Sequence, residues 1–95
     1  MAIKVLSPIY LEKYNINLTN MILSFKGSCR LYYNTNNQNE RIYWISGSLF
    51  YYADRDKQFL HLENIDVTCP DNLSGNPLDY LYSIIKNRYE QIEDI

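Results

Sequence analysis

The amino-acid sequence predicts one mainly β (α+β) domain over residues 1–95, an antiparallel meander or small sandwich with one C-terminal helix packed on it. At 95 residues the chain can close one hydrophobic core but cannot divide it between two. Hydrophobic residues make up 46% and charged residues 21%, which is ordinary for a folded domain. Strand-length apolar runs fill the chain up to residue 69, and a helical period follows only after residue 76.

The first strands lie in residues 2–6 and 18–25. The first run closes at Ser7 and Pro8, because proline donates no ladder hydrogen bond and restricts the residue before it. The second run alternates, with one apolar face made of Met21, Leu23 and Phe25. Gly27 then permits a turn.

Residues 28–34 alternate with a period of two, which is typical of a half-buried antiparallel strand. We expect the first set of side chains to be buried: Cys29, Leu31 and Tyr33. The opposite set then points outward: Arg30, Tyr32 and Asn34. Residues 35–40 are polar and rich in Asn, so they predict a hairpin loop.

Residues 41–53 form the longest predicted strand, and this strand is apolar on both faces. We expect a bulge at residues 46–48, and we expect the strand to be central and covered on both sides. One helix covers only one face of a meander, so the second face requires another sheet or a neighbouring subunit. A charged turn at 54–57 leads into a returning strand at 59–69, with a break near Glu63 and Asn64.

A C-terminal helix is predicted over about 77–92. Asn76 is suited to cap it, Pro77 suits the first helical position and Asp79 follows in the first turn. An apolar stripe recurs at helical spacing, made of Leu78, Leu81, Ile85, Tyr89 and Ile92. The acidic residues at its end oppose the helix dipole, so we expect the last turn to fray.

The sequence contains no pattern that predicts an enzyme, a metal site or another cofactor. His61 is the only histidine, and it has no ligand-like neighbour at a suitable spacing. Four carboxylates fit a solvated turn and strand better than paired-acid catalysis: Asp54, Asp56, Glu63 and Asp66. Residues 26–28 lack the upstream glycines of a phosphate-binding loop.

Charge and hydropathy exclude two further classes of partner. The net charge is −2 and no basic stripe is present, so we expect no nucleic acid. No apolar run approaches the roughly 20 residues that cross a bilayer, and the first residues do not form a secretory signal, so we expect no membrane association. Cys29 and Cys69 are expected as buried free thiols, with a disulfide as the alternative.

Ten tyrosines are the most unusual feature of the composition. Tyrosine provides rigid contact area at small entropic cost, so the bias favours a protein-binding role; codon bias of an AT-rich genome explains it equally well. We predict a protein-binding surface that includes Arg30, Tyr32 and Asn34, because Arg and Tyr often anchor interfaces. The alternatives are that these are ordinary surface residues or that a second sheet folds over them.

Three segments resemble small virion proteins of crAss-like tailed bacteriophages, which infect gut Bacteroidota. They are residues 4–9 (KVLSPI), 17–28 (NLTNMILSFKGS) and 76–82 (NPLDYLY). The resemblance implies a non-enzymatic structural protein of the virion, assembled in the host cytoplasm. It would be an auxiliary or decorating capsid protein that binds capsid shell subunits or copies of itself. A tail or connector component is the next choice, and a small phage-encoded inhibitor of a host protein is an alternative of a different class.

Overall fold

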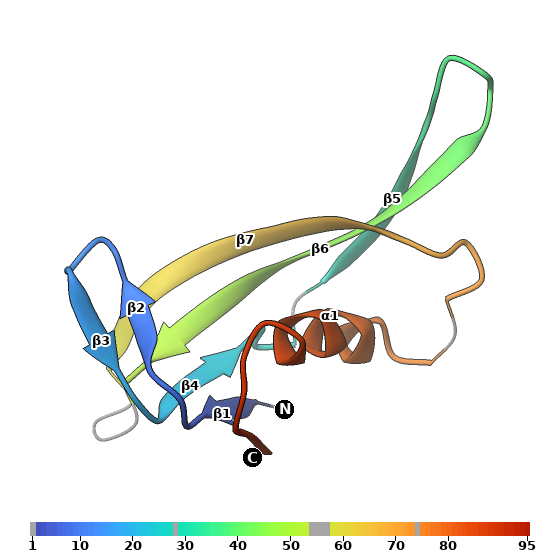
Figure 1. Cartoon of the computed structure of the whole chain (residues 1–95). Coiled ribbons are helices and arrows are strands. Elements are labelled where there is room, and N and C mark those ends of the chain that lie inside the picture. The colour runs from blue at the N-terminus through green and yellow to red at the C-terminus, as the bar shows by residue number, and fades with distance from the viewer. Residues whose placement is uncertain (1, 28, 54–57, 74) are drawn as a thin grey trace.

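The computed structural model describes residues 2–27, 29–53, 58–73 and 75–95 of the chain (Figure 1). One helix and eight strands are present in these residues: β1 (Ile3–Val5), β2 (Ile9–Leu11), β3 (Ile16–Leu18), β4 (Met21–Ser24), β5 (Arg30–Thr35), β6 (Arg41–Tyr52), β7 (Phe59–Cys69), α1 (Pro77–Lys86) and β8 (Ile92–Asp94). The mainly-β fold class with one C-terminal helix is therefore confirmed. None of the described helical residues form a span that is long and apolar enough to cross a bilayer.

Strand β6 organises the main six-stranded antiparallel sheet. β7 pairs along residues 43–52 of β6, while β5 pairs with residues 41–46 and β4 with residues 50–52. Because β7 overlaps both of the others along β6, β5 and β4 share the opposite edge of that strand. The sheet continues from β4 through β1 to β8, and β2 and β3 form a separate two-stranded sheet. The predicted meander corresponds to β5, β6 and β7.

The molecule is elongated, with extents of 48 × 27 × 21 Å. Figure 1 shows the cause: β5 and the first half of β6 project as a hairpin beyond the body formed by the helix and the other strands. We call residues 30–46 the β5–β6 arm. The predicted hairpin loop is confirmed at its tip, where Asn36 Oδ1 accepts from the backbone N–H groups of Gln38 and Glu40 and Asn39 adopts a φ of 59°.

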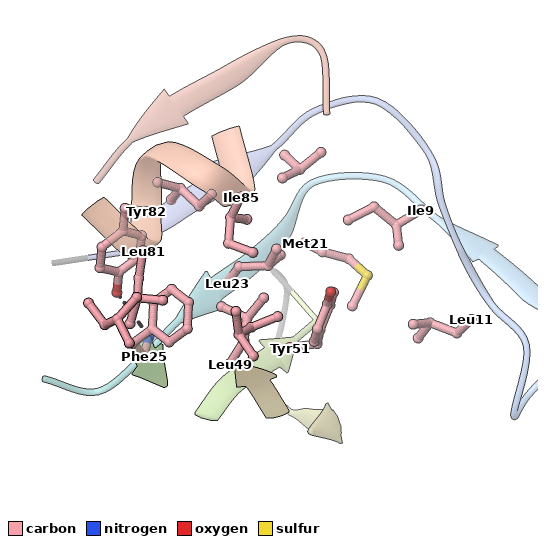
Figure 2. Close-up of a cluster of buried hydrophobic side chains, with 14 residues drawn as sticks. Ile9, Leu11, Met21, Leu23, Phe25, Leu49, Tyr51, Leu81, Tyr82 and Ile85 are labelled. Atoms are coloured by element: carbon pink, nitrogen blue, oxygen red, sulfur yellow. Dashed lines mark hydrogen bonds between the residues drawn. The ribbon is translucent and has the colours of Figure 1, made fainter. Parts of the chain in front are cut away.

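The core lies between α1 and one face of the sheet, and the β2–β3 hairpin closes one end of it (Figure 2). As predicted, Leu81 and Ile85 of α1 are fully buried and Leu78 packs against them at the periphery. The buried side chains are Ile3, Val5, Ile9, Leu11, Met21, Leu23, Phe25, Ile45, Leu49, Tyr51, Ile65, Leu81, Tyr82 and Ile85. The predicted apolar face of the second strand is thus in the core.

The helix begins as predicted but ends six residues early. The Asn76 side chain accepts a 3.0 Å hydrogen bond from the Leu78 N–H, and Pro77 occupies the first turn. The helix ends at Lys86, and residues 92–94 form β8 against β1 instead of a frayed last turn. Tyr89 and Ile92 still pack against the core. Their helical spacing from Ile85 was coincidental, because strand pairing gives the backbone of this segment its hydrogen bonds.

Three predictions about the strands were wrong. The expected bulge at residues 46–48 is absent: Gly47 pairs regularly with Ile65, and the only register shift that the β6–β7 ladder shows lies between Tyr51 and Tyr52. The returning strand β7 has no break at Glu63, since its ladder runs unbroken through that residue. The segment 18–25 contains the end of β3 and all of β4, separated by a left-handed Asn20 (φ 58°). The charged turn at 54–57 lies outside the described residues.

The second face of β6 is not covered within the described part of the chain, so of the two expected covers the neighbouring subunit stays a prediction. Its apolar side chains are only partly buried, and they are Ile42, Trp44, Phe50 and Tyr52. These aromatic rings pack beside cross-strand and same-face neighbours instead, as Phe50 does with Tyr52 and Phe59. No second sheet folds over this face in the residues described.

Candidate protein-binding surface and adjacent cleft

The three residues predicted to bind protein lie together on one face of the β5–β6 arm. The Arg30 guanidinium carbon is 4.7 Å from the centre of the Tyr32 ring, and that ring lies nearly parallel to Trp44 at 6.4 Å. Asn34 Oδ1 accepts a 3.3 Å hydrogen bond from Trp44 Nε1. Trp44, which the sequence prediction did not include, therefore contacts Tyr32 and Asn34, and Arg30 joins them through the Tyr32 ring.

Tyr32 is held in place by a contact to the neighbouring strand. Its hydroxyl donates a 2.6 Å hydrogen bond to Asp66 Oδ1 on β7. This bond, together with desolvation, raises the pKa of Tyr32 above its ordinary value, so the phenol stays protonated as the donor. The ring is therefore fixed before any partner binds, which lowers the entropic cost of an interface.

The other face of the arm is more exposed than predicted. Leu31 and Tyr33, expected to be buried, are 51% and 53% exposed. Ile45, the cross-strand partner of Leu31, is fully buried because it lies nearer the body, while the arm extends beyond α1 (Figure 1). The alternation does give β5 two faces, as predicted, but neither face is covered.

This second face repeats the arrangement of the first. The Arg41 guanidinium carbon lies 4.8 Å from the centre of the Tyr33 ring, which in turn contacts Tyr43 at 5.9 Å. A hydrogen bond to Tyr43 raises the pKa of Arg41 further above its already high value, so its charge is permanent. Each face of the arm thus presents an arginine packed on a pair of aromatic rings.

Strand β5 also forms an end of the main sheet. No strand pairs with its outer edge among the described residues, and its ladder with β6 is in continuous register. The six residues contain no proline or lysine, which are common devices that discourage edge-to-edge pairing. The free N–H and C=O groups of such an edge are suited to accept one more strand.

Two arginines lie beside the aromatic residues of the arm, and Asp66 of β7 adds a carboxylate next to Tyr32. Arg30 and Arg41 have no carboxylate partner in the described part of the chain, where the ion pairs are Lys86 with Asp94 and Arg88 with Glu63. Sequence reasoning missed Arg41, Trp44, Leu31 and Tyr33 as surface residues. The usable signal was that residues 41–52 are apolar on both faces while one short helix cannot cover the length of such a strand.

A cleft of about 590 Å³ lies at the opposite end of the sheet, below the β2–β3 hairpin. Its lining comes from three separate segments, with Ile9, Tyr10, Leu11, Glu12 and Lys13 on one side, Tyr51, His61 and Glu63 on the sheet, and Arg88 and Tyr89 after the helix. Figure 2 labels Ile9, Leu11 and Tyr51, which border it on the core side.

The Glu63 carboxylate is the centre of a hydrogen-bond network in this cleft. Arg88 Nη1 donates to both of its oxygens at 3.0 Å, and the Tyr51 hydroxyl donates to Oε1 at 2.7 Å. The Tyr89 hydroxyl lies 3.2 Å from that of Tyr51. Burial raises the pKa of Tyr51 far above its ordinary value, with further increases from Tyr89 and Glu63.

The structure separates the carboxylates that the sequence analysis considered as a group. Glu63 faces the cleft, whereas Asp66 bonds Tyr32 on the other face of β7. Asp54 and Asp56 lie outside the described residues. The His61 ring packs on Tyr51 with centroids 5.3 Å apart. Within the described ranges, no three His, Cys, Asp or Glu residues are placed to hold a metal ion.

No protein-family model, curated protein or solved structure matches this chain.

Proposed function

We propose that this chain is a non-enzymatic structural protein that joins a larger protein assembly through the β5–β6 arm. The observation that carries the proposal is the exposure of Leu31 and Tyr33 on an arm that already has both faces lined with aromatic rings. An element that contributes little to its own core but presents apolar area, fixed rings and arginines has the composition of an interface core.

The proposed contact combines strand addition with side-chain packing. A partner strand would pair with the outer edge of β5, and its side chains would lie beside Leu31 on one face and Arg30 on the other. Acidic groups on the partner would complement the two arginines of the arm. A second copy of this chain would bring its own Glu40 and Asp66 carboxylates along with its two arginines, so it offers no excess of acidic groups to the arm.

The proposed assembly is the capsid of a crAss-like tailed phage, in which the chain would be an auxiliary protein on the shell. The sequence resemblance supports this part of the proposal, and an arm that projects from a small body suits a protein that is anchored between shell subunits. A tail or connector location uses the same arm. An inhibitor of a host protein differs, because it would act in the infected cell and not on the particle.

Mass spectrometry of purified particles and of infected cells distinguishes these roles. A capsid protein is expected in particles at a copy number comparable with that of the shell subunit. Recovery in tail fractions at low copy number would instead support the tail or connector role. Absence from particles, together with early appearance in infected cells, would overturn the structural proposal.

The arm itself is tested with two matched pairs of substitutions. The double variant Leu31→Ser with Tyr33→Ser removes exposed apolar area from the arm. The control, Leu62→Ser with Phe59→Ser, removes one leucine and one aromatic ring of similar exposure from the other end of the sheet. Circular dichroism establishes that both variants fold. Only the arm variant is expected to lose incorporation into particles, and equal incorporation of both would place the interface elsewhere.

A further inference from the structure

The cleft below the β2–β3 hairpin has features of a ligand site that the proposed role of the arm does not use. Its volume of about 590 Å³ is in the range of small-molecule sites, which are usually concave, largely apolar and equipped with a few convergent polar groups. It also contains Tyr51, whose pKa is raised far above its ordinary value by burial. Three segments distant in sequence meet there.

The polar side chains of the cleft are held in place by contacts with one another, but some of their hydrogen-bond donors and acceptors are unused. Arg88 uses only Nη1 to bind Glu63, so its Nη2 and Nε atoms have no hydrogen-bond partner in the described residues. The His61 ring packs on Tyr51, and its nitrogens likewise have no partner there. The cleft therefore offers fixed donors beside a carboxylate and a tyrosine hydroxyl that still accept hydrogen bonds.

The formal charges around the cleft cancel. Glu12 and Glu63 contribute two negative charges, and Lys13 and Arg88 contribute two positive charges. An isolated anion would be attracted to Arg88 but repelled by Glu63 within the same pair. A neutral ligand that both donates and accepts avoids this conflict.

The remaining lining is apolar. The exposed Tyr10 and the half-buried Tyr89 supply rings, while Tyr51, Ile9 and Leu11 are almost fully buried at the core side. A suitable ligand therefore combines an apolar ring face with groups that each donate and accept hydrogen bonds. A pyranose has this combination, because its C–H faces pack on aromatic rings and neighbouring hydroxyls match a paired carboxylate and guanidinium.

We infer that this cleft binds a neutral saccharide, with Arg88 and Glu63 engaging adjacent hydroxyls and His61 and Tyr89 contacting the same sugar. The site is independent of the arm, so it stands whether or not the arm joins a virion. It gives the chain a second binding function at the end of the molecule opposite the arm.

The test uses the full chain labelled with ¹⁵N and ¹³C, titrated with the methyl glycosides of glucose, galactose and mannose in separate NMR experiments. At least one glycoside is expected to shift the resonances of His61, Arg88 and Tyr89 in a saturable manner while those of Arg30 and Tyr33 stay unchanged. Sodium phosphate and sodium acetate at the same concentrations serve as anion probes. Saturable shifts with an anion but with none of the glycosides would overturn the inference, and so would glycoside shifts that map outside the cleft or no shifts at all.

Two variants and one control assign the site to these side chains. Arg88→Lys keeps the charge but removes the planar fork, and it is expected to weaken glycoside binding by about tenfold. Arg30→Lys makes the same chemical change on the arm and should leave the affinity unchanged. His61→Ala provides a second test that does not disturb the Glu63 ion pair. Unchanged affinity in both cleft variants would contradict the assignment.

Discussion

The backbone N–H of Phe25 donates a 2.9 Å hydrogen bond to the hydroxyl of Tyr82, and the two rings meet edge to face with centroids 5.0 Å apart (Figure 2). Both side chains are almost fully buried. The contact joins α1 to the point where the chain leaves β4 on its way to the arm. A backbone donor that has left the sheet ladder thus finds its acceptor on the helix.

Replacing Tyr82 by Phe is expected to lower the free energy of unfolding by about 1–3 kcal/mol, because the buried Phe25 N–H loses its acceptor. Urea denaturation measures the change. Tyr80→Phe is the matched control, since its hydroxyl makes only an exposed 3.3 Å bond to the Thr68 carbonyl. A loss no greater than that of the control would show that the Phe25 N–H gains little from the bond.

Leu81 is fully buried where α1 meets the sheet, so its side chain is predicted to be essential for packing. Truncation to Ala should cost about 2–5 kcal/mol, and Asp should lower the melting temperature further because it places an unpaired charge in the core. Ser83→Asp, two residues along the same helix on its exposed side, should have a much smaller effect. Similar melting curves for Leu81→Asp and Ser83→Asp would mean that the helix does not pack as described.

Stability should fall at high pH in a manner that depends on Tyr51. Below about pH 10, the ordinary tyrosine pKa, folded and unfolded chains both keep this proton. Above it the unfolded chain releases the proton while the folded chain, with its raised Tyr51 pKa, retains it, so stability decreases as pH rises. The Tyr51→Phe variant is expected to be less stable at neutral pH. Between about pH 10 and 12 its free energy of unfolding should fall less steeply than that of the unchanged chain, by up to about 1 kcal/mol per pH unit. Parallel pH profiles for the two proteins would refute this.

Both cysteines are free and half-buried, which agrees with the expected thiols except that neither is fully enclosed. Burial raises the pKa of Cys69, so little of it is thiolate near neutral pH. Iodoacetamide should therefore react slowly with Cys69 in the folded chain. After denaturation without reductant, the intact mass should show two alkyl groups. An unalkylated chain two hydrogens lighter would indicate the disulfide instead.

Short sequence patterns predicted the elements whose structure depends on residues close together in the chain. Asn76 and Pro77 specify the helix start through capping, and the Asn-rich loop specifies the arm's turn. The helix end was missed because β8 forms only when β1, nearly 90 residues away in the chain, provides its partner. The candidate site was likewise predicted only in part, because the exposure of its residues depends on elements that are distant in the sequence. A period of two in β5 gives two faces, but whether Leu31 is covered depends on how far α1 reaches along the sheet.

The pairing of β1 with β8 brings Ile3 opposite Asp94, and backbone hydrogen bonds run both ways between Ala2 and Ile95. Figure 1 shows the two chain ends close together. Such a contact requires closure of a very long loop, whereas the β5–β6 and β6–β7 hairpins need only short ones. The meander is therefore expected to form first during folding, and β8 to dock after the rate-limiting step. Ile92→Ala should then accelerate unfolding while leaving the folding rate nearly unchanged in stopped-flow measurements. On this view β8 sets how long the native state persists, and the meander sets how quickly it is reached.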